Sequence, residues 1–324
     1  MKNGLRILVA IFAALSISTA SASEFGDTLD QFIQSPQGLT QVKRFLTLPE
    51  NKPDLAIQSA SLVAETKVSR IYQMAIDGNF VAPIRFQISV PSSVNFDASA
   101  SLSKYPVVVL LSGIHTGDKL LNLINDQSEV VVISFQYPLA KPLNQQPIKD
   151  VLEGIYETPK QVAALLSWLN DQNWINKFQM HVMGISLGTL FLPLSQRIAQ
   201  SWGTYINSSI FAYGGGDLKS FIRFGFEDSL DSGQVLTLVD SLQVVTAFLE
   251  PKNHYPSLQG RFLVVEGTNE DVFPTWSVEA LRYGIPEPKD IRYIEGPHIS
   301  SKRLDLIQKL GIEVNTWLTQ LGAL

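Results

Sequence analysis

Short runs of mostly apolar residues recur through the chain between residues 105 and 294, and segments of helical character separate them. A strand is apolar at successive positions when both of its faces are buried, as in a parallel sheet that helices cover on two sides. Strands that alternate with helices are typical of α/β proteins, so the sequence predicts a mostly parallel, doubly covered sheet. The runs are 105–111, 130–135, 178–183, 209–213, 261–265 and 291–294.

The N-terminal part of this sheet is expected to be antiparallel. Two candidate strands, 61–77 and 80–91, are joined at residues 77–79, whose Asp-Gly step is a strong hairpin signal. The segment 85–90 alternates polar and apolar residues, as a half-buried strand does. The fold class expected is therefore α/β, with an antiparallel N-terminal hairpin before the parallel strands.

Two of the helices carry recognisable end signals. Thr158-Pro159 has the pattern of an N-cap followed by proline at the first helical position, and apolar residues then recur at helical spacing over 162–169. The last helix is expected over about 301–318, with Gly311 as a break inside it. Each helix has one apolar stripe, which is the face expected to pack on the sheet.

The first 22 residues predict a secretory signal peptide. Lys2 and Arg6 precede a short apolar run, and a small-residue A-x-A pattern ends at Ala22. The run is too short for a transmembrane helix, which needs about 20 residues. We therefore expect cleavage after Ala22, export to the periplasm or the medium, and no stable membrane anchor after cleavage.

The rest of the chain is divided into an N-terminal extension, 23–60, and one α/β domain, 61–324. Within that domain the interval 214–260 interrupts the alternation of strands and helices, because it opens with three glycines and continues with two apolar helical stretches. An insertion of this kind predicts a small helical lid over the carboxyl edge of the sheet. The alternative is an ordinary crossover helix followed by a long loop.

Composition excludes several classes of function. The 324 residues contain no cysteine, which excludes disulfides, thiolate metal sites, iron–sulfur clusters and cysteine nucleophiles. The formal net charge of −5 gives nucleic acid no attractive field, and the four histidines form no metal-binding pattern. No cofactor, metal or nucleic-acid partner is therefore expected.

A G-x-S-x-G motif, formed by Gly184, Ser186 and Gly188, ends one apolar run and opens a helix that extends to about Trp202. A sharp strand-to-helix turn holds such a serine at the edge of the sheet, and the flanking glycines let the backbone pass close to itself. The start of the helix directs free N–H groups toward an anion formed there. The motif therefore predicts that Ser186 is a nucleophile.

A serine nucleophile needs a histidine base that is itself held by an acid. Of the four histidines, only His298 lies in a loop after a late strand. The strand 261–265 leads into an acidic loop that contains Glu270 and Asp271. The order along the chain is therefore serine, acid, histidine, with either carboxylate as the acid.

In its motif, its strand order and the order of these three residues, the chain resembles the α/β-hydrolase superfamily over about residues 60–320, with an esterase- or lipase-like site. The resemblance implies that Ser186 is the nucleophile and that His298 is the general base and acid. It also implies an oxyanion hole built from the N–H of Leu187 and an N–H of the loop after the strand 105–111, for which we name Ile114.

The resemblance also bears on the acid. In the family this residue usually stands three positions after the glycine of a Gly-x-x-Asp loop, and that position here is Glu270, with Asp271 one later. Pro274 keeps the family's spacing from Gly267, which favours Glu270 and leaves Asp271 as the alternative. Glutamate is an accepted variant of this acid.

The function expected is that of an exported serine hydrolase that cleaves a carboxylic ester, or a related acyl bond, through an acyl-enzyme. The apolar lid favours a hydrophobic small molecule as the acyl substrate. The alternatives are a peptidase, thioesterase or dienelactone-type hydrolase on the same scaffold, and a non-catalytic binding protein with the same fold.

Overall fold

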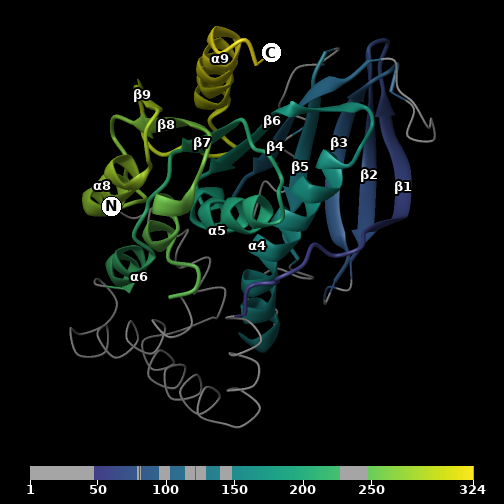
Figure 1. Ribbon diagram of the computed structural model, residues 1–324. Coiled ribbons are helices and arrows are strands. Elements are labelled where there is room, and N and C mark those ends of the chain that lie inside the picture. The colour runs from purple at the N-terminus through teal and green to yellow at the C-terminus, as the bar shows by residue number, and fades with distance from the viewer. Residues whose placement is uncertain are drawn as a thin grey trace.

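The computed structural model describes residues 47–78, 80, 82–94, 103–113, 121, 129–138, 148–226 and 247–323. The strands in these residues are β1 (Ala56–Glu65), β2 (Ser69–Asp77), β3 (Ile84–Pro91), β4 (Tyr105–Leu111), β5 (Val131–Gln136), β6 (Ile175–Ile185), β7 (Ser208–Ala212), β8 (Arg261–Gly267) and β9 (Lys289–Ile294). They form one sheet in the order β1-β2-β3-β5-β4-β6-β7-β8-β9, with β1 and β9 at its two ends (Figure 1).

Strand directions divide the sheet into two parts. Three neighbouring pairs are antiparallel: β1–β2, β2–β3 and β3–β5. The other five pairs, from β5–β4 to β8–β9, are parallel. The predicted mostly parallel sheet with an antiparallel N-terminal part is therefore confirmed.

Helices cover both faces of the parallel part. They are α4 (Ile148–Asn170), α5 (Gly188–Ser201), α6 (Leu218–Phe226), α8 (Thr275–Gly284) and α9 (Leu304–Gln320), with two short 3-10 helices, η4 (Pro251–Asn253) and η5 (Tyr255–Ser257). Val107 and Val109 of β4 join the buried cluster that contains side chains of α4 and α5, while Val108 joins the cluster that contains those of α9. This burial on both faces explains the mostly apolar runs and confirms the predicted double cover.

The antiparallel part differs in detail from the prediction. The range 61–77, expected as one strand, holds the end of β1, a tight turn and β2. The Thr66 hydroxyl makes this turn by accepting the N–H groups of Val68 and Ser69 at 3.2 and 3.0 Å. A Thr-Lys-Val turn of this kind has none of the Gly, Pro, Asn or Asp residues that mark most turns, so the sequence pattern conceals it.

The strand boundaries next to this turn also shift. β1 begins at Ala56, inside the range predicted as an N-terminal extension, and β3 begins at Ile84 rather than at residue 80. The connection between β2 and β3 is therefore longer than the short hairpin turn that the Asp-Gly step predicts.

Two helix predictions also need correction. α4 begins at Ile148, so Thr158 and Pro159 lie inside the helix rather than at its N-terminus, and the Thr158 hydroxyl donates to the Gly154 carbonyl at 2.7 Å. α9 continues through Gly311 without a break. Packing on the sheet overrides the local preference of proline and glycine in both helices.

The interval predicted as a lid is described in part. Its first apolar stretch forms α6, and its end holds η4 and η5, while residues 227–246 lie outside the described residues. The predicted signal peptide, 1–22, also lies outside them. Among the helices described, none is both long and apolar enough to span a bilayer.

Candidate active site

Ser186 follows the last residue of β6 and precedes α5, in the strand-to-helix turn that the motif predicts. Its φ of +53° is left-handed, a conformation that is costly for a residue with a Cβ atom. The turn is held by the Ser186 N–H, which donates to the Ala212 carbonyl of β7 at 2.9 Å. The Ser186 carbonyl accepts two hydrogen bonds from Thr189, one from its backbone N–H at 3.0 Å and one from its side-chain hydroxyl at 2.6 Å.

Close backbone packing explains both glycines of the motif. A Cβ atom at Gly184 would lie 2.8 Å from the Gly188 carbonyl oxygen, and one at Gly188 would lie 1.9 Å from that of Leu111. Real Cβ atoms do not approach backbone this closely, so only glycine fits at either position. The second contact also brings the carboxyl end of β4 against the start of α5.

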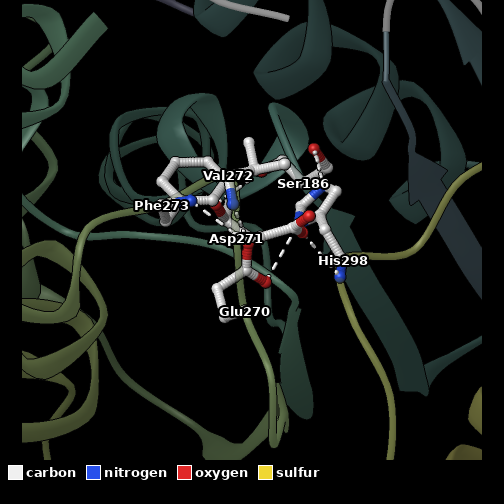
Figure 2. Close-up of polar contacts among 7 residues, drawn as sticks. Ser186, Glu270, Asp271, Val272, Phe273 and His298 are labelled. Carbon is white, nitrogen blue, oxygen red and sulfur yellow. Dashed lines mark hydrogen bonds and ion pairs between the residues drawn. The ribbon is translucent and has the colours of Figure 1, made fainter. Parts of the chain in front are cut away.

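The three residues predicted for catalysis meet at the carboxyl edge of the parallel strands (Figure 2). His298 Nε2 lies 2.8 Å from Ser186 Oγ, and His298 Nδ1 lies 2.9 Å from both carboxylate oxygens of Glu270. Glu270 comes from the loop after β8, and His298 from the loop after β9. Since β6, β7, β8 and β9 are consecutive and parallel, their carboxyl ends deliver these side chains to one edge of the sheet.

The hydrogen-bond partners assign the tautomer of His298. An ionised carboxylate only accepts hydrogen bonds, so Nδ1 carries the proton that points to Glu270. Nε2 then presents its lone pair to the Ser186 hydroxyl, which donates to it. The Glu270 carboxylate also accepts the N–H groups of Val272 at 2.8 Å and Phe273 at 3.1 Å, which keeps it oriented toward the imidazole.

Asp271, the alternative acid, contacts the same histidine at a different atom. Its carboxylate accepts the backbone N–H of His298 at 3.2 Å. The structure thus brings Glu270, and not Asp271, to the imidazole ring.

The contacting side chains are shielded from water. Ser186 is 8% exposed and His298 is 6% exposed. Two aromatic rings, Tyr213 and Phe273, lie with their centroids 6.0 and 5.8 Å from that of the imidazole. Phe221 of α6 stacks on Phe273 at 4.4 Å, so α6 contributes to an aromatic wall next to His298.

The two predicted oxyanion donors differ in what can be described. Leu187 directly follows Ser186 and is the N-cap residue of α5, where the first backbone N–H groups have no partner inside the helix. Ile114 lies outside the described residues. Only the first two residues of its loop, Ser112 and Gly113, are described. The Ser112 carbonyl accepts the Tyr137 hydroxyl at 2.6 Å.

The other described histidines make contacts elsewhere. His181 Nδ1 lies 2.6 Å from Ser208 Oγ between β6 and β7. His254 Nε2 donates to the Phe248 carbonyl at 2.8 Å, while its Nδ1 accepts from Arg197 at 3.2 Å. No group of three or more His, Asp or Glu side chains that could hold a metal ion occurs among the described residues.

Sequence reasoning missed three contributors to this site: Thr189, Tyr213 and the backbone contact of Asp271. Thr189 follows the motif directly, and Tyr213 ends an apolar run just before three glycines, so position alone could have drawn attention to both. The role of Asp271 depends on loop geometry that no sequence pattern carries.

Comparisons with known proteins find similarity in structure but not in sequence. No protein-family model matches the chain, and no curated protein matches its sequence. Acetyl xylan esterase 1 from Thermoanaerobacterium sp. JW/SL YS485 superposes with a TM-score of 0.57 at 15% identity, over 87% of this chain and 92% of that one.

Two further solved structures have TM-scores above 0.5. The acetyl xylan esterase from Paenibacillus sp. R4 has a TM-score of 0.56 at 12% identity, over 85% of this chain and 92% of its own. A puromycin-hydrolyzing peptidase of Mycobacterium tuberculosis has a TM-score of 0.51 at 18% identity, over 71% of this chain and 35% of its own. These likenesses establish the fold.

Proposed function

We propose that this chain, which has the α/β-hydrolase fold, is a serine hydrolase that cleaves a carboxylic ester or a related acyl bond. The observation that carries the proposal is the unbroken hydrogen-bond series from Ser186 through His298 to Glu270. The fold alone hosts many functions, whereas a hydroxyl aligned with a carboxylate-bound imidazole has a specific chemical use.

In the proposed mechanism Ser186 Oγ attacks the acyl carbonyl carbon while His298 Nε2 takes the hydroxyl proton. The imidazolium formed is stabilised by Glu270, which stays ionised. The tetrahedral intermediate collapses when Nε2 returns the proton to the leaving oxygen, so that an alcohol departs and an acyl-enzyme remains. Water, deprotonated by the same nitrogen, then releases the acid and restores Ser186.

The negative oxygen of the tetrahedral intermediate needs donors that are already in place. We assign this role to the backbone N–H of Leu187 and, as a second donor, that of Ile114. Loss of one such donor costs about 3 kcal/mol of transition-state stabilisation in a comparable site. The contact between Gly188 and Leu111 supports this pairing, since it brings the end of β4 against the start of α5.

Two observations favour an ester of a hydrophobic small molecule over a peptide. The Phe273 ring lies beside His298, and Phe221 stacks on Phe273, so the imidazole has an aromatic side. The two esterases that superpose here have TM-scores of 0.57 and 0.56, above the 0.51 of the peptidase.

Export is part of the proposal, supported by the basic, apolar and small-residue pattern of residues 1–22. The full chain, expressed in a Gram-negative host, is expected outside the cytoplasm with Ser23 as its first residue. N-terminal sequencing of that fraction tests this, and recovery of uncut cytoplasmic protein would refute it.

A fluorophosphonate probe, which reacts with activated serines, tests the hydrolase proposal directly. The wild-type protein is expected to be labelled at Ser186, and Ser186→Ala is expected to fold but remain unlabelled. Ester, thioester and peptide substrates assayed side by side should then show fastest turnover of the ester.

Circular dichroism of both proteins controls for folding. A folded wild type that neither reacts with the probe nor turns over any of the three substrates would contradict the proposal and favour a binding protein. Turnover that survives Ser186→Ala would contradict the mechanism.

A further inference from the structure

Tyr213 directly follows β7, the strand next to β6, which leads into Ser186. Its φ is +52°, and in the described part of the chain Ser186 and Tyr213 are the only non-glycine residues with positive φ. A left-handed backbone costs about 1–2 kcal/mol for such a residue. Strain of this kind persists where surrounding structure over-determines it, and it concentrates at functional sites. The strained backbone of Tyr213 therefore indicates that this residue has a functional role.

The end of β7 contacts several parts of the candidate active site. The Ala212 carbonyl accepts the Ser186 N–H, and the Tyr213 N–H donates to the Val265 carbonyl of β8 at 2.8 Å. A Cβ atom at Gly214 would lie 2.0 Å from the hydroxyl oxygen of Thr189, the residue that holds the Ser186 carbonyl. Tyr213 is thus fixed between the nucleophile turn and the strand that leads to Glu270.

The Tyr213 ring packs against His298. The two ring centroids are 6.0 Å apart and the ring planes meet at 82°, an edge-to-face arrangement that is favourable for aromatic pairs. A Cβ atom at Gly267 would lie 2.9 Å from Tyr213 Cε1, so the end of β8, just before the loop that carries Glu270, packs against the same ring. Tyr213 is 1% exposed, which leaves the ring little freedom to move.

The ring, rather than the hydroxyl, makes these contacts. Tyr213 Oη is buried and has no hydrogen-bond partner among the described residues. Burial, reinforced by the negative charge of Glu270, raises the pKa of Tyr213 to about 12, so the hydroxyl stays neutral at ordinary pH. A neutral, unpartnered hydroxyl adds no hydrogen bond that could hold the histidine.

We propose that Tyr213 is a positioning residue for His298: its strained backbone aims a buried ring at the imidazole and keeps Nε2 on Ser186 and Nδ1 on Glu270. The activity measurements that test this inference rest on the proposed hydrolase function. The orientation of the imidazole can be observed separately, through the low-field proton resonance of Nδ1–H bonded to Glu270.

Two variants of Tyr213 separate its ring from its hydroxyl. Tyr213→Phe keeps the ring and should retain kcat within about twofold, because the lost hydroxyl had no partner. Tyr213→Asn removes the ring but tolerates the left-handed backbone. Its kcat for an ester should fall about tenfold to a hundredfold with KM little changed, since misplacement of a reacting group by about 1 Å costs this much. The Nδ1–H resonance should persist in Tyr213→Phe and broaden or vanish in Tyr213→Asn.

Tyr255 offers a matched control. It is also fully buried with an unpartnered hydroxyl, but its ring packs edge-on against Phe211. Tyr255→Leu should lower the free energy of unfolding yet leave kcat and the Nδ1–H resonance of the folded protein unchanged.

Each result decides between the possibilities. Wild-type kcat and an intact resonance in Tyr213→Asn would overturn the inference alone, as would an equal loss of both in Tyr255→Leu. A wild type without turnover, but with a resonance that Tyr213→Asn abolishes, would overturn the hydrolase function and leave the positioning of His298 standing.

Discussion

At the scale of single residues, two adjacent carboxylates hold one histidine by different atoms. Glu270 accepts the ring N–H of His298, whereas Asp271 accepts its backbone N–H. The first contact fixes the tautomer and stabilises a positive imidazole, and the second fixes the loop that carries the ring. Their substitution should therefore have unequal effects on catalysis.

Glu270→Gln should lower kcat by about 10⁴-fold, because an amide in place of the acid favours the wrong histidine tautomer. Asp271→Asn keeps an oxygen that can accept the His298 N–H, so its kcat should fall less than about tenfold, the loss expected for about 1 kcal/mol. Steady-state kinetics on an ester would measure both. A larger loss in Asp271→Asn than in Glu270→Gln would show that the acid has been assigned to the wrong residue.

At the scale of elements, the fit of α5 against β4 depends on one missing methyl group. Gly188→Ala would place its Cβ 1.9 Å from the Leu111 carbonyl oxygen, so the helix or the strand must move. Overpacking of this kind costs about 1–3 kcal/mol, and the displaced turn carries Ser186. We expect a lower free energy of unfolding in urea and slower labelling by the fluorophosphonate probe.

The same substitution on another helix should act in the opposite direction. Gly311 lies inside α9, is exposed, and has nothing within 4 Å of an added Cβ. Gly311→Ala should stabilise the protein by about 0.5–1 kcal/mol, since alanine loses less backbone entropy in a helix. Equal destabilisation by both substitutions would mean that the contact with β4 is not the cause.

The elements that sequence patterns predict well are those buried on both faces. β4 spans residues 105–111, as predicted, because double burial leaves an uninterrupted apolar run. The turn at Thr66 has no sequence signal because a threonine side chain closes it. The part of α4 before Thr158 has none because Pro159 marks a helix start, whereas tertiary packing lets the helix run through it.

Prediction of the site has a similar limit. Ser186 and His298 could be proposed as partners because motif and chain order carry that information. The choice between Glu270 and Asp271 could not be made from the residues alone, since it depends on which carboxylate the loop turns toward the ring. The left-handed backbone of Tyr213 has no signature in the sequence.

At the scale of the whole molecule, a buried histidine links stability to pH. His181 is fully buried at the centre of the sheet, and burial lowers its pKa from 6.5 to about 4. Between these values the unfolded chain binds a proton that the folded chain does not, so the free energy of unfolding falls as pH falls. The loss is about 1.4 kcal/mol per pH unit, or about 3 kcal/mol in all, and it is complete below pH 4.

Urea unfolding at pH 7 and pH 4.5, on the wild type and on His181→Gln, would isolate this effect. All the other titratable groups are the same in both proteins, so their contribution cancels in the comparison. The wild type should lose about 2–3 kcal/mol more than the variant on acidification. Equal losses would show that His181 does not titrate in this range.

The assembly of the site from distant strands also affects when the protein can act. Ser186 and His298 are 112 residues apart in the chain, and Glu270 and His298 come from loops near its carboxyl end. Under the proposed mechanism, a nascent or unfolded chain carries an inert serine until β8 and β9 have joined the sheet. The topology thus couples catalytic competence to completion of the fold, so that a chain whose last strands have not yet paired hydrolyses nothing.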